Sequence, residues 1–104
     1  MPPNEDVVQI SYDGSVEKDR AGFGGVMRDY LGGVKCLFSG GSSVRSVITQ
    51  ELLAIWHGIK GAKELGFEKI EVTSDSLRVV HLLQQKEAPP WYTKVERQVP
   101  IVLY

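Results

Sequence analysis

A long apolar-periodic segment in the middle of the chain constrains the fold most. It lies between the cap candidates Ser42, Ser43 and Ser46 and the stop residue Gly66. On a helical wheel its apolar residues form one stripe, made of Ile48, Leu52, Ile55, Ile59, Ala62 and Leu65. The segment is therefore predicted to be a helix that packs this stripe against the rest of the protein.

Strand patterns lie on both sides of this helix. Residues 7–12 alternate in polarity and are expected to end at Asp13-Gly14, and residues 22–28 and 33–40 are glycine-rich stretches joined by hairpin-type residues 29–32. After the helix, the β-branched residues 69–73 predict a strand parallel to the first. The pattern thus predicts an α/β fold with three antiparallel strands, then a parallel strand, with helices packed on the mixed sheet.

The end of the chain has a weaker pattern. A second helix after Ser76 would bury Val79, Val80 and Leu83, and Pro89-Pro90 then breaks the chain. Residues 91–104 predict a short helix interrupted near Pro100. No internal repeat or linker is visible, so residues 1–104 are interpreted as one domain, with its motifs in 7–85 and a connecting segment in 86–104.

The composition of the chain excludes several classes of protein. The chain has 12 Lys plus Arg against 13 Asp plus Glu, so its net charge of -1 attracts no nucleic acid at long range. The single cysteine, Cys36, excludes a disulfide framework and fits a reducing compartment. No apolar run is long enough for a membrane span, and the first residues do not have the pattern of a signal peptide. We therefore expect an intracellular protein, in the nucleus or the cytoplasm, without a membrane partner.

Three carboxylates are expected to converge at one edge of the sheet. Asp13 follows the first strand, Asp75 follows the strand of residues 69–73, and Glu51 lies on a helix margin where the neighbouring residues are small. Each alone has a simpler interpretation: Asp13 as a turn residue, Glu51 as a surface charge and Asp75 as a helix cap. Together they would repel one another unless they held a hard cation such as Mg²⁺.

The motifs around these residues resemble those of the RNase H fold, specifically the plant RNase H-like, reverse-transcriptase-like domains. The resemblance rests on SYDGS (11–15), AGFGGVMRDYLGG (21–33), QELLAIWHGIKGAKELGF (50–67) and IEVTSDS (70–76). It implies that Asp13, Glu51 and Asp75 are the catalytic residues and the metal ligands. It also implies hydrolysis of the RNA strand of RNA-DNA hybrids by an endonuclease with two Mg²⁺ or Mn²⁺ ions, of which this chain would hold one.

The resemblance also implies substrate contacts. Gly14 and Ser15 would touch the 2′-hydroxyl of the RNA, the group that distinguishes RNA from DNA. Ser46 and Thr49 would meet a phosphate at the start of the long helix, where free amides favour anions. The expected partner is an RNA-DNA hybrid or another nucleic acid.

Part of the family pattern is missing from the sequence. The fifth strand, the last helix and the fourth carboxylate of the family are expected beyond residue 104, so the fold is predicted to be C-terminally incomplete. Residues 69–73 would then form an open edge that invites self-association. A second hypothesis is therefore a catalytically inactive remnant that acts as a nucleic-acid or protein interaction module. A third is an incomplete gene product without an independent function.

Other patterns point to structure rather than to chemistry. The glycines of residues 22–25 precede a strand and lack the spacing of a dinucleotide-binding loop. Trp56 and Trp91 are interpreted as covering core edges rather than as stacking bases. His57 and His81 lie off the apolar stripes of their helices, so we interpret both as solvated surface residues.

Overall fold

The computed structural model describes residues 6–18, 20–74, 76–84 and 88–103. The strands are β1 (Val7–Val16), β2 (Ala21–Arg28), β3 (Val34–Gly41), β4 (Lys69–Thr73) and β5 (Ile101–Leu103). The helices are α1 (Val47–Glu64), α2 (Leu77–Gln84) and α3 (Pro90–Glu96). Within the described residues, no helix is both long and apolar enough to cross a membrane.

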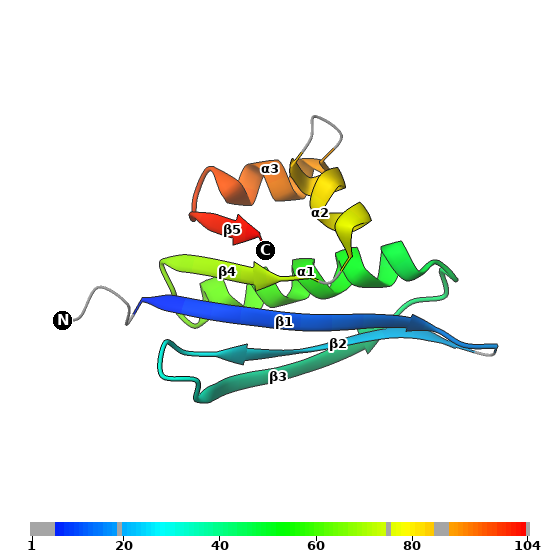
Figure 1. The fold of residues 1–104 in the computed structure, drawn as a ribbon, viewed down its shortest axis with the longest axis horizontal. Coiled ribbons are helices and arrows are strands. Elements are labelled where there is room, and N and C mark those ends of the chain that lie inside the picture. The colour runs from blue at the N-terminus through cyan, green and yellow to red at the C-terminus, as the bar shows by residue number, and fades with distance from the viewer. Residues whose placement is uncertain (1–5, 19, 75, 85–87, 104) are drawn as a thin grey trace.

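All the strands form one mixed sheet in the order β3-β2-β1-β4-β5 (Figure 1). β1 pairs antiparallel with β2, and β2 pairs antiparallel with β3. β4 runs parallel to β1, and β5 runs parallel to β4. The predicted α/β class, with three antiparallel strands followed by a parallel one, is therefore confirmed.

The C-terminal edge of the sheet differs from the prediction. Ile70 pairs with Ile101 and Val72 pairs with Leu103, so β5 covers β4 and the predicted open edge at residues 69–73 is wrong. The missed strand follows Pro100, whose ring ends the preceding helical turn and leaves three apolar residues to extend. Self-association through an exposed β4 loses its structural basis, because the described edge strands are β3 and β5.

β1 is longer than its sequence pattern indicated. The strand was expected to end at Asp13-Gly14, but it continues to Val16, with Asp13 opposite Gly24 and Gly14 opposite Phe23. The chain leaves β1 only after Val16, where the N–H of Glu17 donates to the carbonyl of Arg20 at 2.7 Å. A glycine after an aspartate is compatible with a strand when the facing strand supplies its hydrogen bonds, which the local pattern could not show.

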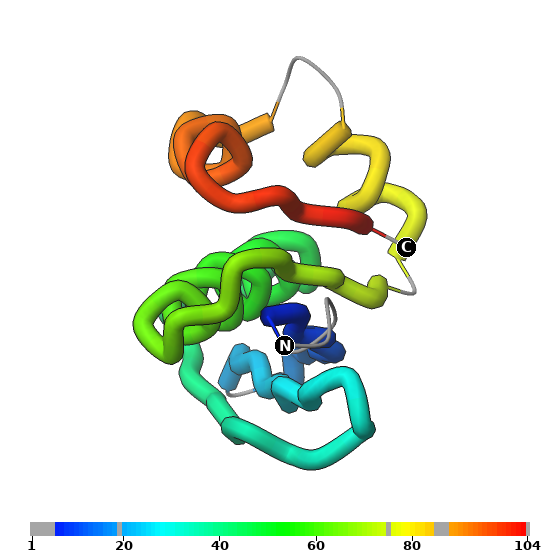
Figure 2. The backbone as a smooth tube through the Cα atoms, turned by 90° about the vertical axis from the view of Figure 1, so that its left-hand side faces the viewer, coloured from blue at the N-terminus to red at the C-terminus, as the bar shows by residue number. Residues whose placement is uncertain are grey.

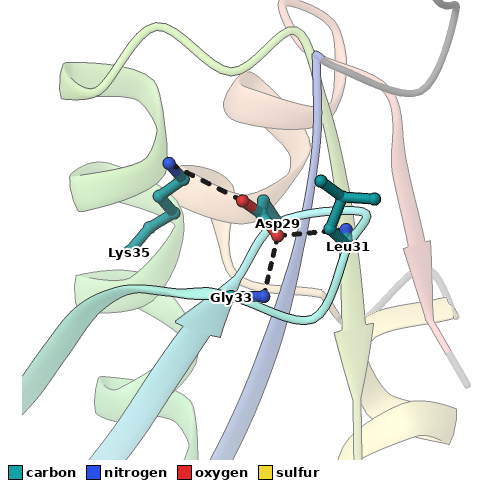
Figure 3. A network of polar contacts seen from close by, with 4 residues as sticks. All are labelled: Asp29, Leu31, Gly33 and Lys35. Carbon is teal, nitrogen blue, oxygen red and sulfur yellow. Dashed lines mark hydrogen bonds and ion pairs between the residues drawn. The ribbon is translucent and has the colours of Figure 1, made fainter.

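The connection between β2 and β3 is the hairpin that residues 29–32 predicted. Asp29 Oδ1 accepts hydrogen bonds from the N–H groups of Leu31 at 3.0 Å and Gly33 at 2.8 Å, and Lys35 Nζ lies 3.6 Å from Oδ2 (Figure 3). Gly32 has the positive φ of 85° that the turn requires. The N–H of Gly33 is the main reason why the pKa of Asp29 lies below its ordinary value of 3.8, and Leu31 and Lys35 lower the pKa further.

α1 lies across one face of the sheet (Figure 2). Ser46 caps its start and Gly66, with a φ of 87°, follows its end, so both predicted boundaries are confirmed. The residues that it buries are Gln50, Glu51, Ala54, Ile55, Gly58, Ile59 and Ala62. The buried face is thus rotated from the predicted stripe toward the small residues, since a helix approaches a sheet most closely where its side chains are smallest.

The rotation changes the surroundings of three predicted stripe residues. Ile48 and Leu52 are only half-buried, and Leu65 is 55% exposed. α2 buries Val79 and Leu83 as predicted, whereas Val80 is half-buried. The core therefore forms mainly between β1, β4 and α1, and α2 and α3 extend it toward β5.

Candidate metal centre

Asp13 is exposed on the part of β1 that extends beyond the end of its parallel neighbour, β4. The pairing between β1 and β4 ends at Ser11 and Thr73, two residues before Asp13. Along β1 the buried residues Val8 and Ile10 face α1, whereas Gln9 and Asp13 fall on the alternate, exposed positions. The Asp13 carboxylate is therefore presented to solvent beyond the carboxyl end of β4.

Gly14 brings the helix against the strand beside this carboxylate. A Cβ atom at Gly14 would lie only 3.0 Å from the backbone nitrogen of Glu51 and 3.1 Å from its Cγ. Such contacts are tighter than most Cβ atoms make, so the absence of a Cβ at position 14 lets α1 approach β1 closely here. Glu51 itself is 6% exposed, which makes it one of the two buried polar residues of the described chain.

The end of β4 is tied to the same region of β1. The hydroxyl of Tyr12 donates to Ser74 Oγ at 2.6 Å, and Ser74 Oγ also accepts from the N–H of Ser76 at 3.1 Å. Asp75, the third predicted ligand, lies outside the described residues. Ser76 Oγ accepts from the N–H of Val79 at 3.3 Å, so Ser76 caps the start of α2.

The structure thus brings Asp13 and Glu51 to neighbouring positions on β1 and α1, with Ser74 beside Tyr12. Within the described residues, no three His, Cys, Asp or Glu side chains form a group that could hold a metal ion. The predicted set of three ligands includes Asp75, so it stays a prediction.

The predicted substrate-contact residues fall into two groups. Gly14 and Ser15 follow Asp13 directly on β1, and Ser15 is exposed opposite Gly22. Ser46 Oγ accepts from the N–H of Thr49 at 3.3 Å, so the Ser46 oxygen serves the first turn of α1. Thr49 lies on the wall of an apolar groove of about 320 Å³, together with Leu52, Leu53, Trp56 and Trp91.

Gln50 is a residue that sequence reasoning missed. It is completely buried, and its Nε2 donates to Ser42 Oγ at 2.9 Å and to the carbonyl oxygen of Val44 at 2.8 Å. The side chain therefore fastens the loop between β3 and α1 to the turn that carries Glu51. Its position four residues before Ala54 places it on the small-residue margin of the helix, and this was the signal for its burial.

The aromatic and histidine residues of α1 form a surface cluster rather than part of this site. His57 is exposed, as expected, and its ring also stacks on Phe23 with centroids 5.1 Å apart. The rings of Trp56 and His57 are nearly perpendicular, with centroids 4.6 Å apart, and Lys60 Nζ lies 5.1 Å from the Trp56 ring centroid. His81 is exposed on α2.

The family follows from comparison with known proteins. A family model described as reverse transcriptase-like matches residues 11–97, which include Asp13 and Glu51. The chain belongs to the reverse transcriptase-like family. Among curated proteins, none matches this sequence.

Solved structures show which fold this family member has. The RNase H1 of the archaeon Halobacterium salinarum superimposes with a TM-score of 0.79 at 18% identity, over 93% of this chain and 82% of that one. An N-terminal RNase H domain from Mycobacterium tuberculosis gives 0.80 at 21% identity, over 94% and 79% of the two chains. A compost-derived RNase H1 in complex with an RNA/DNA hybrid gives 0.75 at 21% identity, over 93% and 83%. The fold is therefore RNase H-like.

Proposed function

We propose that this chain binds RNA-DNA hybrids and hydrolyses their RNA strand with the help of divalent cations. The observation that carries the proposal is the contact of Gly14 with Glu51 beside the exposed Asp13, because it joins two carboxylate-bearing elements where β4 has ended. The similar folds support the choice of substrate, since one of them was solved with an RNA/DNA hybrid bound.

The donor chemistry of this edge fits a hard cation. Asp13 offers an exposed carboxylate. Glu51 offers a second one on α1, which approaches β1 closely at Gly14. Carboxylate oxygens are the ligands that Mg²⁺ and Mn²⁺ accept, and Asp75 would complete the set. When bound, the cation would supply an activated water and stabilise the leaving oxygen.

The remaining residues of the edge would hold and orient the nucleic acid. The backbone of Gly14 and the exposed hydroxyl of Ser15 lie next to Asp13, where they can contact a ribose 2′-hydroxyl. At the start of α1, Ser46 Oγ accepts the capping hydrogen bond, and its O–H group can still donate a hydrogen bond to a phosphate.

Cleavage of a labelled RNA-DNA hybrid, titrated with Mg²⁺ and Mn²⁺, tests this proposal directly. Asp13→Asn should lower metal-dependent cleavage by at least about 100-fold, because it removes an inferred metal ligand rather than a residue that only orients a ligand. His57→Ala serves as the control, because His57 stacks on Phe23 and is not an inferred metal ligand, so its loss should leave cleavage nearly unchanged.

The outcomes separate the hypotheses. Equal effects of Asp13→Asn and His57→Ala on metal affinity would contradict the ligand assignment. Hybrid binding without metal-dependent cleavage would identify the inactive interaction module instead. A chain that neither folds nor binds the hybrid would support the incomplete gene product.

A further inference from the structure

A polar pocket lies between the β1–β2 turn and the loop that leads from β3 into α1. Its volume is about 450 Å³, and its lining residues are Arg20, Ala21, Gly41, Ser42, Ser43 and Arg45. Among the described lining residues, two guanidinium groups combine with two hydroxyls, and none of these residues carries a carboxylate. This combination favours an anion with several oxygens, because guanidinium groups present paired N–H donors that match such oxygens.

The pocket is held in shape by contacts that cross between elements. Arg45 Nη2 donates to the backbone carbonyl of Glu17, which fastens the loop before α1 to the β1–β2 turn. On the other side, the completely buried Gln50 donates to Ser42 Oγ at 2.9 Å. The end of β3 lies close against the start of β2, because a Cβ at Gly41 would lie only 2.6 Å from the carbonyl oxygen of Ala21. The loop therefore has little freedom to collapse into the pocket.

Among the described residues, Glu17 opposes the positive charge of the pocket. Glu17 Oε2 lies 3.6 Å from Arg20 Nε, with side-chain exposures of 67% and 85%. An exposed pair of this kind contributes little stability, so Arg20 can exchange the carboxylate for a stronger anionic partner. The first turn of α1, which follows Arg45, carries no acidic residue. The pocket is thus a local site of positive charge on a chain whose net charge is -1.

We propose that this pocket binds a backbone phosphate of the nucleic acid that occupies the metal centre, an assignment that rests on the proposed function. Asp13 pairs with Gly24, and Ala21 lies three residues away from Gly24 along β2. At strand spacing this is roughly 10 Å, so one nucleic acid reaches both Asp13 and the pocket. The phosphate site therefore includes Arg20 and Arg45, in addition to the predicted contacts at the start of α1.

The salt dependence of hybrid binding tests the assignment. Affinity for an RNA-DNA hybrid is measured at several salt concentrations without divalent cations, so that the RNA strand is not cleaved. Arg20→Gln and Arg45→Gln should each weaken binding about three- to tenfold at low salt, without regard to sequence. Each should also lower the slope of log Kd against log salt concentration by about one.

Two matched variants sharpen the measurement. Arg97→Gln removes the same charge from the exposed end of α3 and should leave both affinity and slope unchanged. Glu17→Gln removes the competing carboxylate, keeps the carbonyl that Arg45 contacts, and should tighten binding about twofold. Thermal unfolding of every variant shows whether the fold persists. If Arg45→Gln unfolds, the exposed Arg20 still tests the assignment alone.

Each result has a separate meaning. Wild-type protein that binds the hybrid with the same affinity and slope as the Arg20→Gln variant would overturn the pocket assignment and leave the proposed function intact. Wild-type protein that fails to bind any hybrid would overturn the proposed function, and the assignment to a nucleic-acid phosphate with it. Inorganic pyrophosphate that shifts the amide resonances of Ser42 and Ser43, while hybrid binding does not depend on Arg20, would show a pocket for free anions and also overturn the assignment.

Discussion

The region of β1, β2, β3 and α1 is built differently from the region of α2, α3 and β5. In the first, long elements approach each other closely at glycines: a Cβ at Gly58 of α1 would lie 3.0 Å from Cγ2 of Ile10. In the second, the elements are three to eight residues long and bury at most two side chains each, such as Val79 and Leu83 of α2 and Tyr92 of α3. The described part of the candidate site depends mainly on the closely packed region, where backbone positions are fixed on several sides.

The largest expected difference between the regions comes from removing equivalent core side chains. Ile10 is completely buried in the central β1, whereas Ile101 is half-buried in the edge strand β5. Ile10→Ala should lower the free energy of unfolding by about 2–5 kcal/mol, through lost burial and an unfilled cavity. Ile101→Ala should cost less than half as much. Chemical denaturation of both variants checks this, and equal losses would contradict the comparison.

A smaller effect is expected from adding a methyl group at the strand–helix contact. Gly14→Ala would press a Cβ against the Glu51 backbone, which cannot rotate away, and should cost about 1–3 kcal/mol. Gly24→Ala is the matched control on the facing strand, where the nearest atom would be at an ordinary 3.6 Å. If both variants have wild-type stability, α1 does not need the close approach at Gly14.

In the second region, alkaline pH should act through a single buried phenol. Burial, and to a smaller extent the charge of Glu96, raises the pKa of Tyr92 to about 12. The unfolded chain therefore releases this proton first, so the stability that Tyr92 contributes is complete below pH 10 and is lost as pH rises toward about 12. By about pH 11 the loss should be about 1 kcal/mol. Tyr92→Phe should abolish this part of the alkaline destabilisation in denaturation curves.

The smallest effect is expected at the β2–β3 hairpin. Because the pKa of Asp29 is lowered, the stability that this carboxylate contributes is present above pH 3.8 and is lost as pH falls through the lower folded value. Asp29→Asn should remove this acid dependence and speed hydrogen exchange at the amides of Leu31 and Gly33. Unchanged exchange at both amides would show that the turn residues hold the hairpin without the carboxylate.

Much of the fold could be predicted because its signals are local. Ser46 and Gly66 mark the ends of α1 through hydrogen bonding and backbone conformation, which depend on a few neighbouring residues. Residues 29–32 predict the hairpin for the same reason. The candidate ligand Asp13 was found through its motif, although the expected end of its strand was wrong.

The missed features depend on contacts between distant segments. β5 forms because Ile101 meets Ile70 on a neighbouring strand, and three residues are too few to give a strand pattern of their own. The burial of Gln50 depends on Ser42 and Val44, which hold both hydrogens of its amide. The helix wheel also placed Leu65 on the buried face, because the wheel takes no account of how closely the sheet approaches the small residues.

The sequence by itself therefore determined the order of the elements from β1 to α2, the ends of α1, the hairpin turn and the carboxylate-bearing motifs, because each follows from periodicity, capping or turn chemistry over a few residues. Only the tertiary structure decided that β1 runs past β4, that Gly14 admits Glu51 beside Asp13, and that Arg20 and Arg45 line one pocket. These features arise where residues far apart in the chain pack together, and close packing selects them according to the space available.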